Sequence, residues 1–336
     1  MLYITTRNNV DTFTSRFPLT TDVAQDGGHY IPYRIPNFTT TEIAALKDSV
    51  FSQTVADILN LFFSCRLSAL DVEFIIGKNP IKIEAVNHRV LFAELWRNMD
   101  GSFAYVTQRL YERIVGGEGQ SNPTDWAKTA VLISVLFGLY GRLLQDQMLD
   151  LDAEFDISVP ADDFLIPMAV WYAREMGLPI KTIICACDEK NSIWELFHRG
   201  TFATNQVPGS LLLGLEKIIV LTLGMKELQR FQESCRKGSI FTLDAEVLTG
   251  FSKGFFCSVA GNHRAGSTIN SVYRSNSYII DPVTAICYGG AQDYRASTAS
   301  GKPVVLLAQE TPLNFSCEVI AATGISEAEL HNCVRR

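Results

Sequence analysis

The chain has 336 residues, 47% of them hydrophobic and 19% charged, which is typical of a globular protein with one large or two smaller domains. A net charge of -7 with scattered lysines and arginines argues against nucleic-acid binding, because phosphate contacts depend on clustered positive charge. No basic segment followed by an apolar run stands at the N-terminus, so we expect no signal peptide and a cytoplasmic location.

A long uncharged and mostly apolar stretch runs from Thr129 to Gly141. It is shorter than the roughly 20 residues needed to span a bilayer, so we interpret it as a buried helix and expect no membrane association. The eight cysteines form no C-x-x-C pair, and most lie within apolar runs. This pattern favours reduced core residues and argues against a structural zinc site.

The N-terminal part begins with a glycine-rich turn and a short strand within residues 25–32. A helix is predicted after Thr39, because Thr39 and Glu42 have the spacing of a capping box and Phe38 and Ile43 that of a hydrophobic staple. Apolar residues at the 3.6-residue period predict the next helix; they are Val55, Ile58, Leu59 and Phe62.

From Ile81 onward, short β-branched runs alternate with long helical patterns. Strands are predicted at 81–86, 155–159, 180–186 and 304–307, and helices at 103–114, 126–144, 164–176 and 284–298. Strands that alternate with helices indicate parallel βαβ units, so the predicted fold class is α/β.

Several segments resemble threonine synthases, in the same order along the chain. Residues 94–106 align without a gap with the family segment E-L-F-H-G-P-T-L-A-F-K-D-F, and further similar segments follow at 122–128, 159–166, 281–286 and 307–315. The resemblance implies the fold type II of pyridoxal-phosphate enzymes, the tryptophan synthase beta-like superfamily, with a parallel-sheet large domain.

The resemblance also predicts a truncated domain arrangement. The family has its small, cofactor-covering domain after the helix at 103–114, whereas here only residues 115–121 connect to the next similar segment. We therefore expect an N-terminal domain at 1–85 and an α/β domain at 86–336, with 115–121 as a short linker that replaces the small domain.

The family lysine that holds pyridoxal phosphate as a Schiff base falls on Ala104, whose methyl group cannot form an imine. The glycine-rich loop that binds the cofactor phosphate corresponds to Asp162, Asp163, Phe164 and Leu165. Two carboxylates would repel the phosphate, and leucine lacks the backbone freedom of glycine.

Three further positions of the implied cofactor cleft depart from the family. Gln309 replaces the threonine that meets the pyridine nitrogen, and Asp125 and Lys128 replace an asparagine and an arginine at a helix start. We therefore predict no catalytic residue and no bound pyridoxal phosphate. Lys78, Lys82 and Lys128 are interpreted as solvated rather than as substitute amines.

Other sites are weaker hypotheses. Asp125, Asp162 and Asp163 have the oxygen ligands of a Mg²⁺ or Ca²⁺ site, but helix capping is the favoured interpretation and no metal is expected. A hydrolase would need a G-x-S-x-G motif, which is absent, and the five histidines stand alone. The polar segment 261–267 is interpreted as an exposed loop.

The leading functional hypothesis is a non-catalytic threonine synthase-like protein that binds a ligand or a protein partner. The alternative is an atypical pyridoxal-phosphate lyase that makes threonine from O-phosphohomoserine through another lysine. Loss of the small domain would expose the helices at 103–114 and 126–144, so we expect a homo-oligomer or a protein partner there unless 210–215 or 251–256 covers them.

Overall fold

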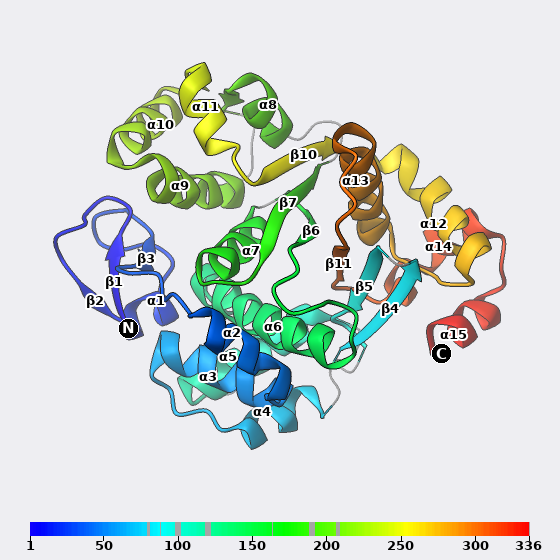
Figure 1. Ribbon diagram of the computed structural model, residues 1–336. Helices are drawn as coiled ribbons and strands as arrows, with labels where there is room; N and C mark the ends of the chain where they lie inside the picture. The colour runs from blue at the N-terminus through cyan, green and yellow to red at the C-terminus, as the bar shows by residue number, and fades with distance from the viewer. Residues whose placement is uncertain are drawn as a thin grey trace.

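The computed structural model describes residues 1–78, 81–87, 89–97, 102–117, 122–162, 164–187, 192–205 and 209–335, without the side chains of residues 87, 210, 262 and 263. The N-terminal part combines a three-stranded antiparallel sheet of order β2-β1-β3 with a group of helices (Figure 1). Its elements are β1 (Leu2–Thr5), β2 (Phe13–Thr14), α1 (Arg16–Thr20), β3 (Tyr30–Pro32), α2 (Thr40–Ala45), η1 (Leu46–Asp48), α3 (Phe51–Phe63) and α4 (Ala69–Ile76).

A six-stranded sheet of order β10-β7-β6-β11-β5-β4 forms the centre of the molecule. Every neighbouring pair is parallel except β4 and β5, which are antiparallel. The strands are β4 (Lys82–Asn87), β5 (Val90–Glu94), β6 (Phe155–Pro160), β7 (Ile180–Cys187), β10 (Phe255–Val259) and β11 (Val304–Ala308). The predicted α/β class is confirmed, and each of the four predicted strands is present.

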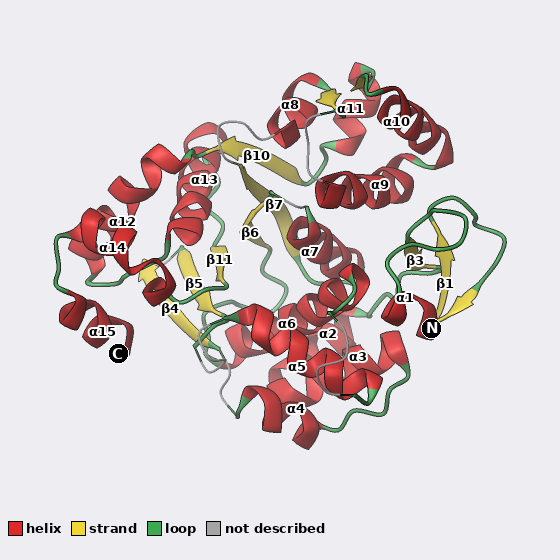
Figure 2. Cartoon of the chain, turned by 180° about the vertical axis from the view of Figure 1, so that it is seen from behind, coloured by secondary structure: helices red, strands yellow, loops and turns green. Residues whose placement is uncertain are grey.

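Helices cover both faces of this sheet (Figure 2). One face packs on α5 (Phe103–Val115), α6 (Asp125–Gln145) and α7 (Leu165–Glu175). The other packs on α12 (Asn262–Asn276), α13 (Pro282–Thr298), α14 (Ser316–Thr323) and α15 (Glu327–Arg335), with η2 (Pro312–Phe315) after β11. Strand side chains alternate between two buried clusters, as strand geometry requires.

A helical lobe lies between β7 and β10 in the chain. It contains α8 (Ser192–Arg199), β8 (Thr201–Ala203), α9 (Gly209–Leu223), α10 (Met225–Lys237), β9 (Ile240–Thr242) and α11 (Ala245–Phe251). Helix α9 packs against α7 and lies beside the N-terminal sheet in both ribbon views (Figures 1 and 2).

The predicted local signals at the N-terminus are confirmed. Thr39 Oγ1 accepts a hydrogen bond from Glu42 N at 3.3 Å, and Glu42 Oε2 accepts one from Thr39 N at 2.8 Å, which completes the capping box. The four apolar residues expected on the next helix are buried in α3. One expectation is wrong: the segment at 261–267, interpreted as a loop, begins α12 at Asn262.

Only residues 116–124 join α5 to α6, and within the described ranges the six-stranded sheet is the sole parallel sheet. A second α/β lobe therefore has no place at this junction. Strand β4 spans the domain boundary expected at 85/86 and pairs with β5, so residues from Lys82 onward take part in the central sheet.

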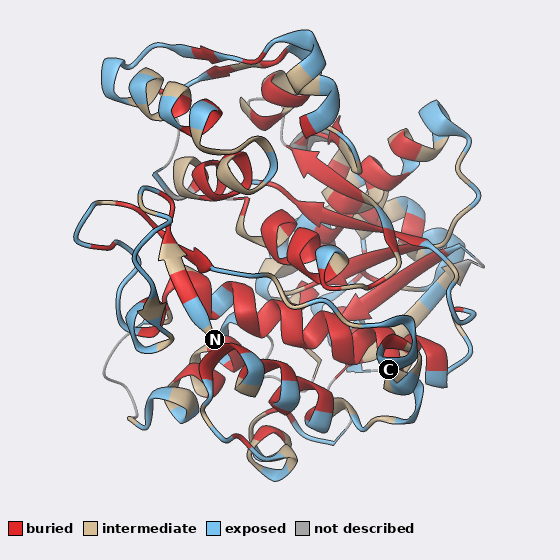
Figure 3. Cartoon of the chain, turned by 60° about the vertical axis from the view of Figure 1, so that its left-hand side comes forward, coloured by how far each residue is buried: buried red, intermediate tan, exposed pale blue. Residues whose placement is uncertain are grey.

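Helix α6 is buried along the whole stretch from Thr129 to Gly141 (Figure 3). By length and composition it resembles a membrane span, but 89% of its most apolar window is buried inside the molecule, so it is the central helix of the fold. Helices α3 and α7 cover it. It therefore presents no apolar face to a partner, contrary to the expectation from the missing small domain.

Aromatic side chains connect the N-terminal part to α6. Trp126 contacts the rings of Tyr3, Phe62 and Tyr172 at centroid distances of 5.7, 5.4 and 5.4 Å. Trp126 Nε1 donates a hydrogen bond to Tyr3 Oη at 3.1 Å, and Tyr3 Oη donates to Phe62 O at 2.9 Å. Both polar groups are thus satisfied inside the core, where an unpaired group would be costly.

We expect Gly141→Ala to destabilise the protein by about 1–3 kcal/mol, because a Cβ at Gly141 would stand 2.7 Å from the backbone oxygen of Leu46. Gly250→Ala in α11 is the matched control, since a Cβ there meets nothing within 4 Å, and its effect should stay within about 1 kcal/mol. Urea unfolding of both variants measures the difference. Equal stabilities would show that the close approach of η1 to α6 is not a constraint.

Candidate functional site

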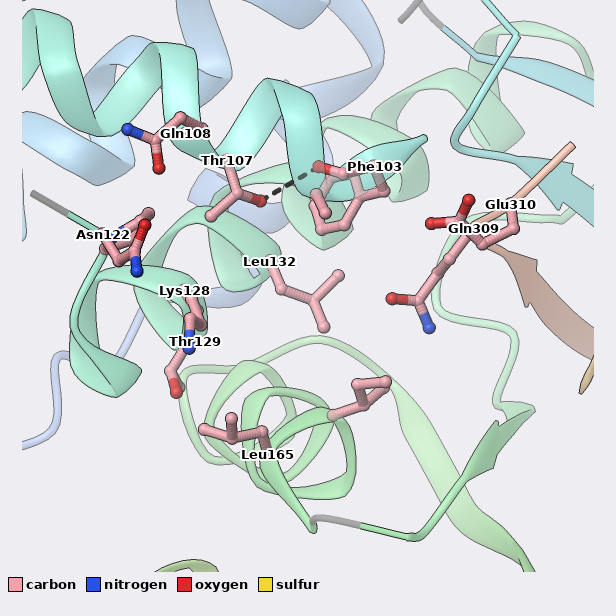
Figure 4. Close-up of a pocket in the computed structure, with 13 residues that line it drawn as sticks. Phe103, Thr107, Gln108, Asn122, Lys128, Thr129, Leu132, Leu165, Gln309 and Glu310 are labelled. Atoms are coloured by element: carbon pink, nitrogen blue, oxygen red, sulfur yellow. Dashed lines mark hydrogen bonds between the residues drawn. The ribbon is translucent and has the colours of Figure 1, made fainter. Parts of the chain in front are cut away.

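A cavity of about 440 Å³ lies where α5, α6 and α7 begin and where the chain leaves β11 (Figure 4). We call it the cleft. Its lining residues are Phe103, Ala104, Thr107, Gln108, Asn122, Pro123, Lys128, Thr129, Leu132, Leu165, Ile166, Gln309 and Glu310.

The start of α5 is held against the segment that follows β11. Ser102 Oγ accepts from Ala104 N at 3.1 Å, which caps the helix, and donates to Glu310 Oε1 at 2.6 Å. Phe103 N donates to Gln309 O at 2.9 Å. These bonds bring Ala104 and Gln309, which are far apart in the sequence, to the same cavity.

The start of α6 is capped by Thr124 rather than by Asp125, which corrects the sequence-based prediction. Thr124 Oγ1 accepts from Ala127 N at 3.1 Å and donates to Pro18 O at 2.6 Å. Asp125 is the first helical residue, and its Oδ1 lies 3.2 Å from Lys128 Nζ. Threonine and aspartate are both good capping residues, so their adjacent positions left the cap ambiguous by one residue.

The start of α7 is unusual because Phe164, with φ 59°, stands in the left-handed region directly before the helix. Its ring is fully buried and stacks on Phe197 and Phe255, each at a centroid distance of 6.2 Å. A bulky residue in this conformation costs of the order of 1–3 kcal/mol, which the packing offsets. Phe164 therefore faces the core, and Leu165 and Ile166 face the cleft.

The structure brings together only some of the predicted cleft positions. Ala104, Lys128 and Gln309 line the cleft, and Asp125 adjoins it through its ion pair with Lys128. Phe164 and the exposed Asp162 do not line it, and Asp163 lies outside the described residues. In the described ranges, no group of three or more His, Cys, Asp or Glu side chains could hold a metal ion.

Sequence reasoning missed other lining residues. Thr107 and Gln108 follow Ala104 by three and four positions on α5, so helical spacing alone would have placed them on the same face. The same spacing places Leu132 four positions after Lys128 on α6, and Asn122 begins the segment at 122–128 that resembles the family.

These residues do not fit pyridoxal phosphate. The wall carries the methyl group of Ala104 where an amine is required, and Leu165 projects its side chain toward the cavity at the start of α7 (Figure 4). Lys128 supplies the one ammonium group among the described lining residues; it is ion-paired with Asp125, and its side chain is 46% exposed. A nucleophilic lysine needs a desolvated position, which Lys128 lacks.

Comparisons with known proteins agree with the resemblance seen in the sequence. The family described as Threonine synthase N terminus matches residues 2–79. Human threonine synthase-like 1 is 22% identical over 222 residues, covering 62% of this chain and 29% of that protein. Threonine synthase of Schizosaccharomyces pombe is 25% identical over 199 residues, covering 50% of this chain and 38% of that protein. The chain thus spans about a third of the length of these relatives.

Solved structures share the fold. The structure of PLP-bound threonine synthase from Brucella melitensis superimposes with a TM-score of 0.82 at 18% identity, covering 100% of this chain and 95% of that one. Yeast threonine synthase superimposes with a TM-score of 0.79 at 16% identity, covering 99% and 94%. The protein therefore has the α/β fold of this group of enzymes. The chain is thus similar to threonine synthases in the sequence of its N-terminal part and in its fold.

We expect Thr124→Ala to destabilise the protein by about 1–3 kcal/mol, because it removes a cap and leaves the Pro18 carbonyl without its donor. Asp125→Asn should cost less than Thr124→Ala, since it removes a partly exposed ion pair, a favourable charge in the first turn and a carboxylate near the buried Lys217, but no cap. Urea unfolding separates the two. If Asp125→Asn lowers the free energy of unfolding more than Thr124→Ala does, Asp125 rather than Thr124 is the residue that fixes the helix start.

Proposed function

We propose that this chain is a non-catalytic threonine synthase-like protein that binds a small ligand or a protein partner, in the cytoplasm. The observation that carries the proposal is Ala104, which lies on the cleft wall at the start of α5, where the family resemblance places the cofactor lysine. Without an amine at this point, covalent attachment of a carbonyl cofactor has no reacting group.

The cleft retains the features of a non-covalent binding site. Apolar side chains such as Phe103, Leu132 and Ile166 line it, and Lys128 adds a positive charge. The side-chain amides of Asn122 and Gln309 also line it, and neither is hydrogen-bonded to a residue in the described part of the chain. This combination supports the binding of a small organic anion. Such a ligand needs an apolar surface, one cation and a few oriented hydrogen-bond donors.

A second surface, on α4, supports the binding of a partner protein. Leu70 and Phe74 on α4 are 75% and 86% exposed, and they border a groove of about 430 Å³ against α5. Large apolar side chains that are adjacent on one helix face and this exposed are unusual on a monomer. If this surface mediates self-association, the wild-type chain sediments as an oligomer at micromolar concentration and Phe74→Ser restores the monomer.

We expect the wild-type protein to form no specific covalent pyridoxyl adduct and to make no threonine from O-phosphohomoserine. The test is incubation with pyridoxal phosphate, borohydride reduction and mass measurement, with yeast threonine synthase as the positive control. Ala104→Lys should acquire an adduct at residue 104 but no activity, because Leu165 and the short α5–α6 connection remain.

An adduct on one lysine of the wild-type chain would contradict the proposal and favour the alternative, an atypical threonine-forming lyase. Lys128 is the lysine to examine first, since it lines the cleft. Lys128→Ala is therefore the matched variant: an adduct that disappears in it identifies Lys128 as a substitute amine.

A further inference from the structure

A second cavity, of about 610 Å³, lies between the N-terminal sheet and the helices α9 and α10. We call it the junction cavity. Arg7 and His29 reach it from the N-terminal part, and Glu216, Gln232 and Arg236 reach it from the lobe. It shares no lining residue with the cleft. Its volume suits a small metabolite.

The floor of the junction cavity carries a buried carboxylate, with the buried ammonium of Lys217 nearby. Glu216 is only 7% exposed, and its Oε1 accepts from Thr6 Oγ1 at 2.5 Å and from Gln232 Nε2 at 3.0 Å. Its Oε2 receives no hydrogen bond from any residue of the described part. Burial and the charge of Glu216 raise the pKa of the Cys235 thiol to about 11, so this charge acts on the cavity wall.

His29 supplies a second acceptor. It is 4% exposed, and its Nδ1 lies 3.0 Å from Asp22 O, so Nδ1–H donates to that carbonyl. Burial and the nearby Lys217 ammonium lower the pKa of His29, and they outweigh the opposing charges of Glu216 and Asp22. The ring is therefore neutral at pH 7, and Nε2 carries a lone pair that no described residue occupies.

The mouth of the cavity carries positive charge. Arg7 and Arg236 are both exposed, and neither is ion-paired with a described residue. Arg7 Nη1 donates to Asp26 O at 3.1 Å, which leaves its other donors available. The guanidinium lies against Gly27, where an added Cβ would stand 2.5 Å from Nη1, so glycine at this turn makes room for it.

This distribution of groups selects a particular ligand chemistry. A primary ammonium has three donors, which match one oxygen each of Glu216 and Gln232 and the Nε2 atom of His29, acceptors that no described residue occupies. A guanidinium at the mouth binds a carboxylate in a bidentate way. Between them, Leu212, Leu213 and Phe231 form an apolar wall. We propose that the junction cavity binds an α-amino acid with an apolar side chain, its ammonium inward and its carboxylate toward Arg7 and Arg236.

The probe is L-leucine, measured by titration calorimetry on the full chain. Two analogues each lack one charged group: 4-methylpentanoate has no amine, and 3-methylbutylamine has no carboxylate. We expect leucine to bind at least about tenfold more tightly than either analogue, since hydrogen bonds to charged groups supply most of the recognition. Absence of leucine binding at roughly millimolar concentration, or equal binding of an analogue, would overturn the proposal.

Variants locate the binding site. Glu216→Gln should weaken leucine binding at least about tenfold, because it removes the buried charge but keeps the shape. Glu227→Gln is the matched control: Glu227 is also buried on the lobe, 2.6 Å from Arg230, but does not line the cavity, so leucine binding should persist. Unchanged binding in Glu216→Gln would refute the site.

Two more variants test the mouth of the junction cavity and exclude binding in the cleft. Arg236→Ala changes an exposed position, so it keeps the test valid if Glu216→Gln fails to fold, and it should also weaken leucine binding about tenfold or more. Lys128→Ala should leave leucine binding unchanged. Loss of binding in Lys128→Ala would place the ligand in the cleft instead, which would overturn this inference without bearing on the absence of a pyridoxyl adduct.

Discussion

The burial of α6 is the constraint on which the other elements depend. Because every residue from Thr129 to Gly141 is buried, the helix must be covered on all sides, by α3, α7, η1 and α5 and by β6 of the central sheet. The first turn of α6 is fixed by Thr124 and Trp126, whose side chains donate hydrogen bonds to the N-terminal part of the chain. The start of α6 is therefore well placed, and with it Lys128 in the cleft. The cleft is thus a consequence of how the core packs.

The shape of the cleft does not depend on an amine at its wall. Its shape comes from three helix starts and the segment after β11, held by backbone and capping hydrogen bonds such as those of Ser102. None of these bonds needs an amine at position 104. The fold and the chemistry of such a cleft are therefore separable, and activity must be argued from the side chains of the site rather than from the fold.

Local sequence signals predicted the fold well and the sites only in part. The capping box at Thr39 and the alternation of strands and helices depend on neighbouring residues, so they could be predicted from the sequence. The loop expected at 261–267 was wrong because Gly261 precedes a helix start instead of ending an element. The junction cavity had no sequence signal, since His29 and Glu216 are brought together only by tertiary packing.

The aromatic contacts of Trp126 have a consequence for synthesis of the protein. Tyr3 and Phe62 belong to the part matched by the N-terminal family, yet their ring partners Trp126 and Tyr172 come much later in the chain. A ribosome adds roughly 5–20 residues per second, so the N-terminal segment waits several seconds for the side chains that complete its core. During that interval its apolar surface is exposed in the nascent chain, where chaperones and aggregation compete for it.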